Sequence, residues 1–376
     1  MQETDYDVIV VGAGFAGVAC AQTLAQHGAS VCVVDRKRDL GERIHTTGIL
    51  VAEALQHACL ADLPAALLRA VPHVRLYAPN LRSVRLAAPD YRFYTTDTPA
   101  LMRWLGEGLV ECGIPLRLGT PFRDAQRTGD HWRLPGIGRA RWLVGADGAT
   151  SRVATCLGLG RVEQWLYGVE HEFDGVALRE PDALHCFISK HYAPGYIGWV
   201  AQTPTGVQAG LARRHVPGSS AVPDIDGFLH HTAVMTGLPA PRRPDSVRAG
   251  LIPCGGPVRP RQRDGVVLIG DAAGMVSPVT AGGIHAGLRH GTAVGLAIVH
   301  NLQQGDASLA LPAMDAVPAF RAKRLLRRAF DHAQFDGLFN LAFRTPFMRC
   351  VAEQLYFHRR GHAVHAPEAD ASARID

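Results

Sequence analysis

Residues 7–35 read DVIVVGAGFAGVACAQTLAQHGASVCVVD, and this stretch decides the fold of the chain. A short apolar run of strand length enters a glycine-rich turn, a helix follows that ends at Gly28, and a second apolar run stops at Asp35. The turn has the spacing G-x-G-x-x-G, with glycines at Gly12, Gly14 and Gly17. Because strand, glycines, helix, strand and acid occur in the required order, the stretch predicts a βαβ unit that binds a dinucleotide.

Each position of this unit has a chemical reason. Gly12 permits the tight turn, Gly14 lets the backbone approach a pyrophosphate, and Gly17 lets the helix pack closely on the strand. The N-terminus of the helix presents free N–H groups to the phosphates. Asp35 lies 18 residues after Gly17, and its carboxylate is predicted to accept hydrogen bonds from a ribose diol.

The segment after Asp35 leaves two interpretations open. Residues 36–51 read RKRDLGERIHTTGILV, a basic cluster followed by a loop-like run of glycine and threonine. The plainer interpretation is a solvated loop. The sharper one is that the segment from Arg43 to Gly48 folds back over a cofactor held by the first turn. Arg36 and Arg43 are therefore candidate cofactor-binding residues.

Composition limits the class of protein. Hydrophobic residues make up 47% of the 376 residues and charged residues 19%, which argues against disorder, and no apolar run reaches the ~18–20 residues of a membrane span. A formal net charge of +5 is too small to predict nucleic-acid binding. The acidic residues Glu3, Asp5 and Asp7 stand where a secretory signal would be basic, so we expect a cytoplasmic protein. The spacing of cysteine and histidine predicts no metal site.

The rest of the chain divides into a cofactor-binding domain and a sheet. Helical spacing is predicted over residues 52–70 and over Thr98–Cys112, with Thr98 as the cap. Short β-like pieces separated by Pro and Gly predict antiparallel sheet. We assign residues 1–72, 98–160 and 250–305 to the cofactor domain, 73–97 and 161–249 to an inserted sheet that holds the substrate, 306–362 to C-terminal helices, and 363–376 to a flexible tail.

Two regions leave alternatives open. Tyr192, Tyr196 and Trp199 lie in the predicted sheet, where they either line a substrate pocket or pack in the core. Residues 320–360 combine a basic cluster with many leucines and phenylalanines. They predict helices that close over the substrate side or, alternatively, a basic amphipathic surface that makes peripheral contact with a membrane.

Two further motifs follow strands far from the first. Residues 143–153, LVGADGATSRV, place Asp147 and Gly148 after a predicted strand. Residues 265–291, GVVLIGDAAGMVSPVTAGGIHAGLRHG, contain a strand and then, in order, Gly270, Asp271, Pro278, Gly282 and Gly283. A carboxylate at the end of a buried strand can accept hydrogen bonds from a polyol, and a helix N-terminus can stabilise negative charge on a flat ring. A ribityl flavin has both features, whereas nicotinamide does not need such a second site.

The three motifs, in this order and at this spacing, resemble those of the flavoprotein group that contains para-hydroxybenzoate hydroxylase. Within that group, residues 277–286 are most similar to the geranylgeranyl reductase family. The resemblance implies an α/β fold with a Rossmann-like FAD-binding domain, an inserted antiparallel β-sheet substrate domain and a C-terminal helical segment.

The resemblance also implies a cofactor and its contacts. FAD would bind with its pyrophosphate at the first three glycines and its adenosine ribose at Asp35. Asp271 would bind the ribityl chain, and the segment from Gly282 to Ile284 would meet the pyrimidine edge of the isoalloxazine. Asp147 and Gly148 would lie near the pyrophosphate and assist the transient approach of NAD(P)H. The family often has a cysteine near the flavin, but this chain has His45, Thr46 and Thr47 there.

Three functions are compatible with these features. The first is an FAD-dependent reductase, in which NAD(P)H-reduced flavin passes hydride to a double bond of an apolar, isoprenoid-type substrate. The second is an FAD-dependent monooxygenase that hydroxylates an aromatic substrate. The third is a non-catalytic lipid-binding or escort protein on a flavoprotein fold. For the reductase, His45 and His285 are candidate proton donors because histidine titrates near neutral pH.

Overall fold

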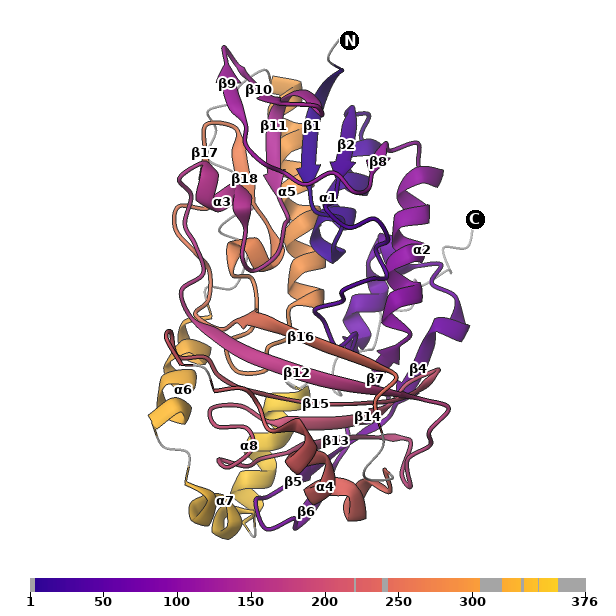
Figure 1. Cartoon of the computed structure of the whole chain (residues 1–376), viewed down its shortest axis with the longest axis vertical. Coiled ribbons are helices and arrows are strands. Elements are labelled where there is room, and N and C mark those ends of the chain that lie inside the picture. The colour runs from indigo at the N-terminus through magenta and orange to yellow at the C-terminus, as the bar shows by residue number, and fades with distance from the viewer. Residues whose placement is uncertain are drawn as a thin grey trace, which may run out of the picture.

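The computed structural model describes residues 4–219, 221–238, 243–304, 320–332, 335–343 and 345–357. Its first sheet has five parallel strands in the order β18-β11-β1-β2-β8 (Figure 1). They are β1 (Asp5–Val11), β2 (Val31–Val34), β8 (Leu116–Arg117), β11 (Gly138–Gly145) and β18 (Val266–Leu268). Three antiparallel strands extend this sheet: β9 (Gln126–Thr128), β10 (His131–Leu134) and β17 (Gln262–Arg263).

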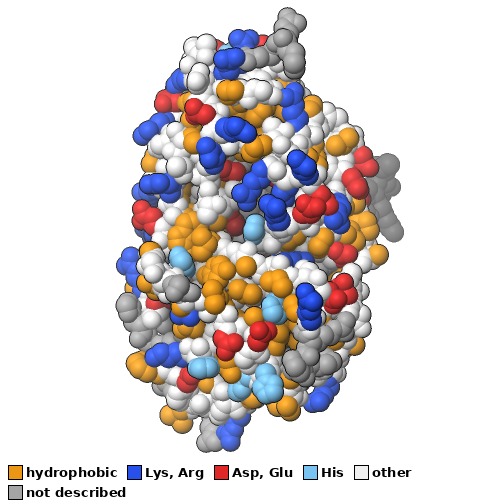
Figure 2. All heavy atoms as spheres, viewed as in Figure 1, with side chains coloured by type: hydrophobic (Ala, Val, Ile, Leu, Met, Phe, Trp, Pro, Cys, Tyr) orange, Lys and Arg blue, Asp and Glu red, His pale blue; other side chains and the backbone are white. Residues whose placement is uncertain are grey.

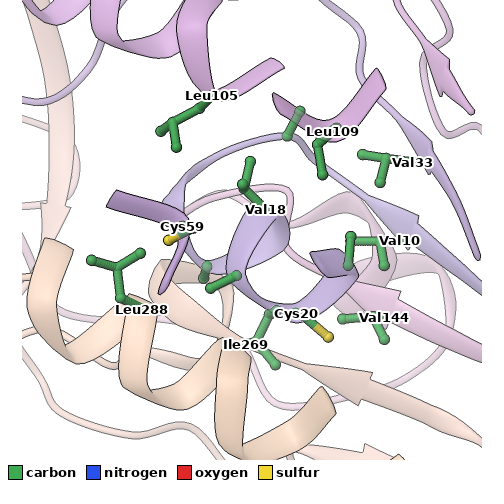
Figure 3. Packing of buried hydrophobic residues seen from close by; sticks show 14 of the residues in the cluster. Val10, Val18, Cys20, Val33, Cys59, Leu105, Leu109, Val144, Ile269 and Leu288 are labelled. Atoms are coloured by element: carbon green, nitrogen blue, oxygen red, sulfur yellow. The ribbon is translucent and has the colours of Figure 1, made fainter. Parts of the chain in front are cut away.

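Both faces of the parallel sheet are buried, which is why its strands read as continuous apolar runs. Val8 and Val10 of β1 belong to one hydrophobic cluster, whereas Ile9 and Val11 belong to the other. The first cluster lies against three helices: α1 (Phe15–Gln26), α2 (Thr98–Glu111) and α5 (Ile284–Gln304). Figure 3 shows side chains from all three helices and from β1, β2 and β11 in this core.

Helices α1 and α5 pack with their backbones in close contact, although they are far apart in the sequence. A Cβ atom on Gly291 would lie 2.2 Å from the backbone oxygen of Ala16, and one on Gly295 would lie 3.0 Å from Cβ of Thr23. Larger residues at these places would push the helices apart. The glycines of α5 therefore hold the third motif against the first.

A second sheet has seven strands in the order β16-β12-β15-β14-β13-β5-β6. They are β5 (His73–Tyr77), β6 (Ser83–Leu86), β12 (Trp165–Asp174), β13 (Ala183–Phe187), β14 (Gly198–Gln202), β15 (Gly206–Arg214) and β16 (Ser246–Pro253). Every neighbouring pair is antiparallel except β13 and β5, which run parallel. Helix α4 (Ile225–Thr236) covers one face, where Phe228 packs against Gly198. The predicted inserted sheet is confirmed, with one parallel junction.

The prediction of a helix over residues 52–70 is wrong. This segment forms three short 3₁₀ turns, η1 (Ala52–Gln56), η2 (Ala58–Leu60) and η3 (Ala65–Leu67), and then enters β4 (Leu68–Val71). Strand β4 pairs with β7 (Phe93–Thr96), which also pairs with β3 (Leu50–Val51) in a separate small sheet. Tertiary pairing with β7 therefore outweighs the local helical spacing of apolar residues.

Two predicted boundaries shift. Strand β16 extends across the predicted domain boundary between residues 249 and 250. Strand β7, which was predicted to lie in the inserted sheet, belongs to the small sheet with β3 and β4. Helix α2 begins at Thr98 as predicted, but Asp97 is its cap, because the Asp97 carboxylate accepts a hydrogen bond from the Ala100 N–H at 3.1 Å. Asp97 stabilises the helix end that Thr98 was predicted to cap.

The C-terminal region is helical where the structure describes it. It contains α6 (Arg321–His332), α7 (Asp336–Ala342) and α8 (Pro346–Phe357), which lie beside the seven-stranded sheet in Figure 1. The predicted tail at residues 363–376 lies outside the described residues. Among the described helices, none combines the length and apolar character needed to span a membrane.

Candidate cofactor and substrate site

The three motifs meet at one edge of the parallel sheet. In register, Val11 of β1 lies beside Val34 of β2 and Gly145 of β11, and Gly145 lies beside Leu268 of β18. The residues that follow these strands therefore share the carboxyl edge: Gly12, Asp35, Asp147 and Asp271. Ligands of open α/β sheets bind at this edge.

The first glycine turn is shaped for close backbone approach. Gly12 has a φ of +108°, and a Cβ on it would lie 2.3 Å from the backbone oxygen of Ala146 in the second motif. A Cβ on Gly17 would lie 2.0 Å from the Gly12 oxygen. Gly14, in contrast, caps α1 with no protein atom within 4 Å of where a Cβ would be. The turn therefore leaves open space in front of the N–H groups of α1, which fits a pyrophosphate.

Asp35 is held in place by the same turn. Its Oδ2 accepts a hydrogen bond from the Ala13 N–H at 2.9 Å, and its Oδ1 accepts one from the Lys37 N–H at 2.8 Å. The carboxylate is half-buried and retains lone pairs that can accept from a ribose diol.

The loop after Asp35 is tied to α2 by an ion pair. Arg103 contacts Asp39 with Nη2 2.7 Å from Oδ2. Arg36 and Arg43 are both exposed on this loop, and Arg43 has a left-handed backbone with φ of 48°. Such a conformation is uncommon for a residue other than glycine and marks a sharply turned loop.

Asp147 has a structural role in its own loop. Its carboxylate accepts hydrogen bonds from the Ser151 hydroxyl and the Arg152 N–H, both at 2.6 Å, and from the Val153 N–H at 3.1 Å. These donors lie at the start of α3 (Arg152–Cys156). Burial raises the pKa of Asp147 above its ordinary value. The neighbouring Gly148 has φ of +80° and open space around it, so its backbone remains accessible.

Asp271 differs from both of these carboxylates. It is half-buried after β18, and no residue in the described part of the chain donates a hydrogen bond to its side chain. Burial raises its pKa to about 6. Burying a carboxylate that accepts no hydrogen bond costs free energy, unless a bound ligand supplies the hydrogen-bond donors. The hydroxyl groups of a ribityl chain are donors of this kind, so Asp271 fits the predicted role.

The third motif folds against the first and against itself. Gly270 has a φ of +57°, and a Cβ on it would lie 2.7 Å from Cβ of Ala16. A Cβ on Gly283 would lie 3.1 Å from Oδ1 of Asp271. The segment between them contains the buried Pro278, and α5 begins at Ile284 directly after Gly283.

Tyr196 joins the inserted sheet to the loop of the third motif. Its hydroxyl donates a hydrogen bond to the Thr280 oxygen at 2.7 Å, and the Ala281 N–H closes the loop onto the Ser277 oxygen at 2.9 Å. Tyr196 and Trp199 also share an apolar cluster with residues of both domains, namely Ile49, Leu166, Ile197, Ala212, Ile252, Cys254 and Ala281. The sheet therefore presents an apolar surface to the loop that was predicted to meet the flavin.

A small pocket of about 30 Å³, partly open to solvent, lies between the loop after β2 and the inserted sheet. One wall is the loop formed by His45, Thr46 and Thr47. The opposite wall is the inserted sheet, which contributes Gly168, Val169, Glu170, Trp199, Arg248, Ala249, Gly250 and Ile252. In Figure 2, hydrophobic side chains gather across the middle of the face, level with β12 and β16 in Figure 1.

The other predicted site residues, His45, His285 and Tyr192, lie in three different parts of the structure. His45 lies in the pocket, with Nδ1 3.0 Å from the Ala249 oxygen. His285 lies in the first turn of α5, with Nδ1 3.3 Å from Nε2 of His57. Tyr192 packs in the cluster beneath α4, on the other face of the inserted sheet from Trp199. The structure does not bring Tyr192 together with Tyr196 and Trp199.

Two charged residues of the pocket, Arg248 and Glu170, were not predicted from the sequence. Arg248, only 7% exposed, pairs with both Glu170 and Glu172, and its Nη1 donates to the Thr46 oxygen at 3.1 Å. It thereby attaches the loop after β2 to the inserted sheet. Residues 165–174, WLYGVEHEFD, contained a signal for Glu170. Side chains alternate between the two faces of a strand, so Glu170 lies on the same face as the apolar Leu166.

Comparisons with known proteins agree with this geometry. A family model described as an NAD(P)-binding Rossmann-like domain matches residues 10–78. The chain is 28% identical over 320 residues to digeranylgeranylglycerophospholipid reductase 2 of Methanopyrus kandleri, which covers 81% of this chain and 79% of that protein. This similarity confirms the resemblance to the geranylgeranyl reductase family that the third motif indicated.

Two solved structures confirm the predicted fold class. A geranylgeranyl bacteriochlorophyll reductase-like protein from Thermoplasma acidophilum has a TM-score of 0.80 at 16% identity, over 96% of this chain and 98% of that one. A probable FAD-dependent monooxygenase from Pseudomonas aeruginosa has a TM-score of 0.61 at 20% identity, over 91% and 100%. At these identities the two structures show the fold alone.

Proposed function

We propose that this chain, a homologue of the digeranylgeranylglycerophospholipid reductases, is an FAD-dependent reductase that saturates double bonds of an apolar, isoprenoid-type lipid with NAD(P)H as the reductant. The observation that carries the proposal is the meeting of the three motifs at one sheet edge beside an apolar pocket. The relative's name supports reduction as the reaction class.

The residues of the chain provide binding, orientation and shielding. The open space at Gly14 and the N-terminus of α1 would hold the pyrophosphate, Asp35 the adenosine ribose, and Asp271 the ribityl chain. The backbone from Gly282 to Ile284, at the start of α5, would stabilise negative charge at the ring edge. Bound FAD, once reduced, supplies a hydride to the substrate. The apolar cluster around Trp199 would orient an isoprenoid chain and exclude water.

An anaerobic reaction tests this proposal directly. Protein loaded with FAD is reduced with NADH or NADPH in the absence of oxygen and then mixed with a geranylgeranyl lipid. We expect the flavin absorbance to recover as the lipid gains two hydrogens for each double bond, measured by mass spectrometry. The same protein mixed in air with an aromatic acid provides the comparison. Oxygen uptake with a hydroxylated product, and no saturated lipid, would assign the monooxygenase activity instead.

We further propose that α6 and α7 make peripheral contact with an anionic membrane, where such a lipid is dissolved. Four large apolar side chains are exposed on or next to these helices: Leu325, Leu326, Phe335 and Leu341. Arg321, Arg324 and Arg328 are exposed on the same helix as the two leucines. Arg327, in contrast, is buried and paired with Asp331 at 2.7 Å, so it belongs to the fold and not to the surface. Basic residues around exposed apolar ones favour the anionic leaflet on the cytosolic side.

Sedimentation with vesicles tests the membrane contact. We expect the protein to sediment with vesicles that contain phosphatidylglycerol and much less with pure phosphatidylcholine. Replacing both Leu325 and Leu326 with glutamate is expected to lower the bound fraction about tenfold or more, because two exposed apolar side chains can then no longer insert into the membrane interface. Leu296→Glu, at an exposed leucine of α5, serves as the control. Equal sedimentation of all three proteins would contradict the contact.

A further inference from the structure

We propose that Glu170 is the acid that supplies the proton when the double bond of the substrate is saturated. This inference rests on the proposed function and adds the missing proton donor to it. Glu170 lies in β12 and is part of the pocket wall opposite His45 and Thr46. Only 4% of the residue is exposed, so the protein shields its carboxyl group from bulk solvent.

The register of the sheet places three glycines around this carboxyl group. Glu170 pairs with Gly210 of β15, and the Trp199 ring lies over Gly210, where a Cβ would be 2.5 Å from the ring. Gly168 and Gly250 pair with each other at the neighbouring position on the same face, and both line the pocket. Backbone therefore forms part of the pocket floor, and the side chains of Ile252 and His45 lie over Gly168 and Gly250, with Cδ1 and Nδ1 3.3 Å and 3.2 Å from where a Cβ would be.

The two carboxyl oxygens of Glu170 have different surroundings. Oε2 accepts a hydrogen bond from Nε1 of Trp199 at 2.7 Å, whereas Oε1 is buried and has no hydrogen-bond partner among the described residues. A buried charged oxygen without a donor is costly, and a neutral carboxyl is much less so. The site favours the protonated acid, and burial raises the pKa of Glu170 to about 7. Because the terminal torsion of glutamate is broad, rotation can turn the O–H toward the pocket.

Three charged or titratable groups face Glu170 from the surrounding elements. Nη1 of Arg248 lies 3.5 Å from Oε1 and lowers the pKa, while Glu172 of the same strand raises it. Arg248 is also paired with Glu172, so its charge is already partly neutralised. His45 lines the same pocket from the opposite loop. Because these effects on the pKa oppose one another, Glu170 can be either protonated or ionised near neutral pH, as a proton donor requires.

The proposed step balances in atoms and electrons. The carbon–carbon π bond breaks and two C–H bonds form. One carbon receives a hydride whose two electrons come from NAD(P)H, and the other receives the proton from Glu170. Glu170 remains as a carboxylate beside Arg248, whose positive charge stabilises it, and takes a new proton from water after the product leaves.

Separation of the two half-reactions tests this role. Glu170→Gln is expected to bind FAD and to oxidise NAD(P)H as the wild type does, but to saturate a geranylgeranyl lipid about a hundredfold or more slowly. Glu170→Asp keeps an acid and should recover part of the rate. Glu163→Gln removes an exposed carboxylate just before β12 and should keep the full rate. Wild-type saturation by Glu170→Gln would overturn the inference, whereas a wild-type protein that saturates no lipid would overturn the proposed function instead.

A second measurement uses the FAD-free protein. Since Trp199 donates to Glu170, ionisation of Glu170 is expected to change the Trp199 fluorescence with a midpoint near pH 7. The signal of Trp199 is the difference between the wild type and Trp199→Phe, because the chain has 5 tryptophans. It should persist in His45→Gln and disappear in Glu170→Gln. A titration that persists in Glu170→Gln, or a wild-type signal that does not change near neutral pH, would contradict a proton held by Glu170.

Discussion

Replacing Gly14 with aspartate is expected to lower the affinity for FAD about a thousandfold and to leave the FAD-free protein as stable as the wild type. Gly14 caps α1 with φ of −79° and ψ of 178°, an extended backbone that any residue can adopt. A Cβ there meets no protein atom within 4 Å. Aspartate is a favourable cap, so the helix is not weakened.

The loss of affinity follows from charge. A carboxylate at Gly14 would face the pyrophosphate, and at ~4 Å with an effective dielectric constant of ~20 the repulsion is about 4 kcal/mol. That energy corresponds to about a thousandfold in the dissociation constant. Titration of flavin fluorescence gives the affinity, and urea unfolding of the FAD-free protein gives the stability.

Two control variants separate the causes. Gly14→Asn has the size and capping ability of aspartate without the charge and should bind FAD more tightly than Gly14→Asp. Gly28→Ala introduces strain at φ of +82° outside the site, so it should cost about 1 kcal/mol of stability and leave FAD binding unchanged. Wild-type affinity in Gly14→Asp would show that no pyrophosphate binds at this turn.

The Asp271→Asn variant is expected to be more stable than the wild type at pH 8 when FAD is absent, yet to bind FAD more weakly. Burial raises the pKa of Asp271 from 3.8 to about 6, so the folded protein holds the proton more tightly than the unfolded chain does. Stability from this group is therefore present below pH ~4 and is lost as pH rises through ~6. Asparagine carries no charge and avoids the loss, a gain of about 1–3 kcal/mol at pH 8.

Binding of FAD should change in the opposite direction. Each hydrogen bond from a ribityl hydroxyl to a carboxylate contributes about 1.5–3 kcal/mol, more than one to a neutral amide. The affinity for FAD is expected to fall about tenfold to a hundredfold. Asp35→Asn is the comparison, because backbone N–H groups already donate to both oxygens of Asp35, so no gain in stability is expected. Equal unfolding free energies of wild type and Asp271→Asn at pH 4 and at pH 8 would contradict this account.

Both predictions concern residues that local sequence identified. The strand, glycine turn and helix of residues 7–35 form in the predicted order, although β1 begins earlier, at Asp5, and α1 ends at Gln26, before Gly28. Their order could be predicted because neighbouring residues set the turn and the helix ends. The acids after the strands could be predicted for the same reason, since parallel strands deliver their carboxyl ends to one edge. Their separate roles could not. The Asp147 carboxylate accepts hydrogen bonds from its own loop, whereas no described residue donates a hydrogen bond to the Asp271 side chain. This difference depends on three-dimensional contacts.

The course of residues 52–70 and the position of Tyr192 were likewise decided by tertiary contacts. Residues 52–70 have the helical spacing of apolar residues, but pairing of β4 with β7 takes the end of this segment into a sheet. Tyr192 looked equivalent to Tyr196 and Trp199 along the chain. The loop before β14 places it beneath α4 instead, on the opposite face of the sheet.

The sequence by itself determined the cofactor framework, because turns, helix ends and strand ends are set by residues close together in the chain. The tertiary structure decided which side chains meet at the pocket. Glu170 and Arg248 pair only because β12 and β16 align in one register, and Arg248 reaches Thr46 only because the sheet lies against the loop after β2. The chemistry of the pocket depends on these contacts between distant residues, which no local pattern specifies.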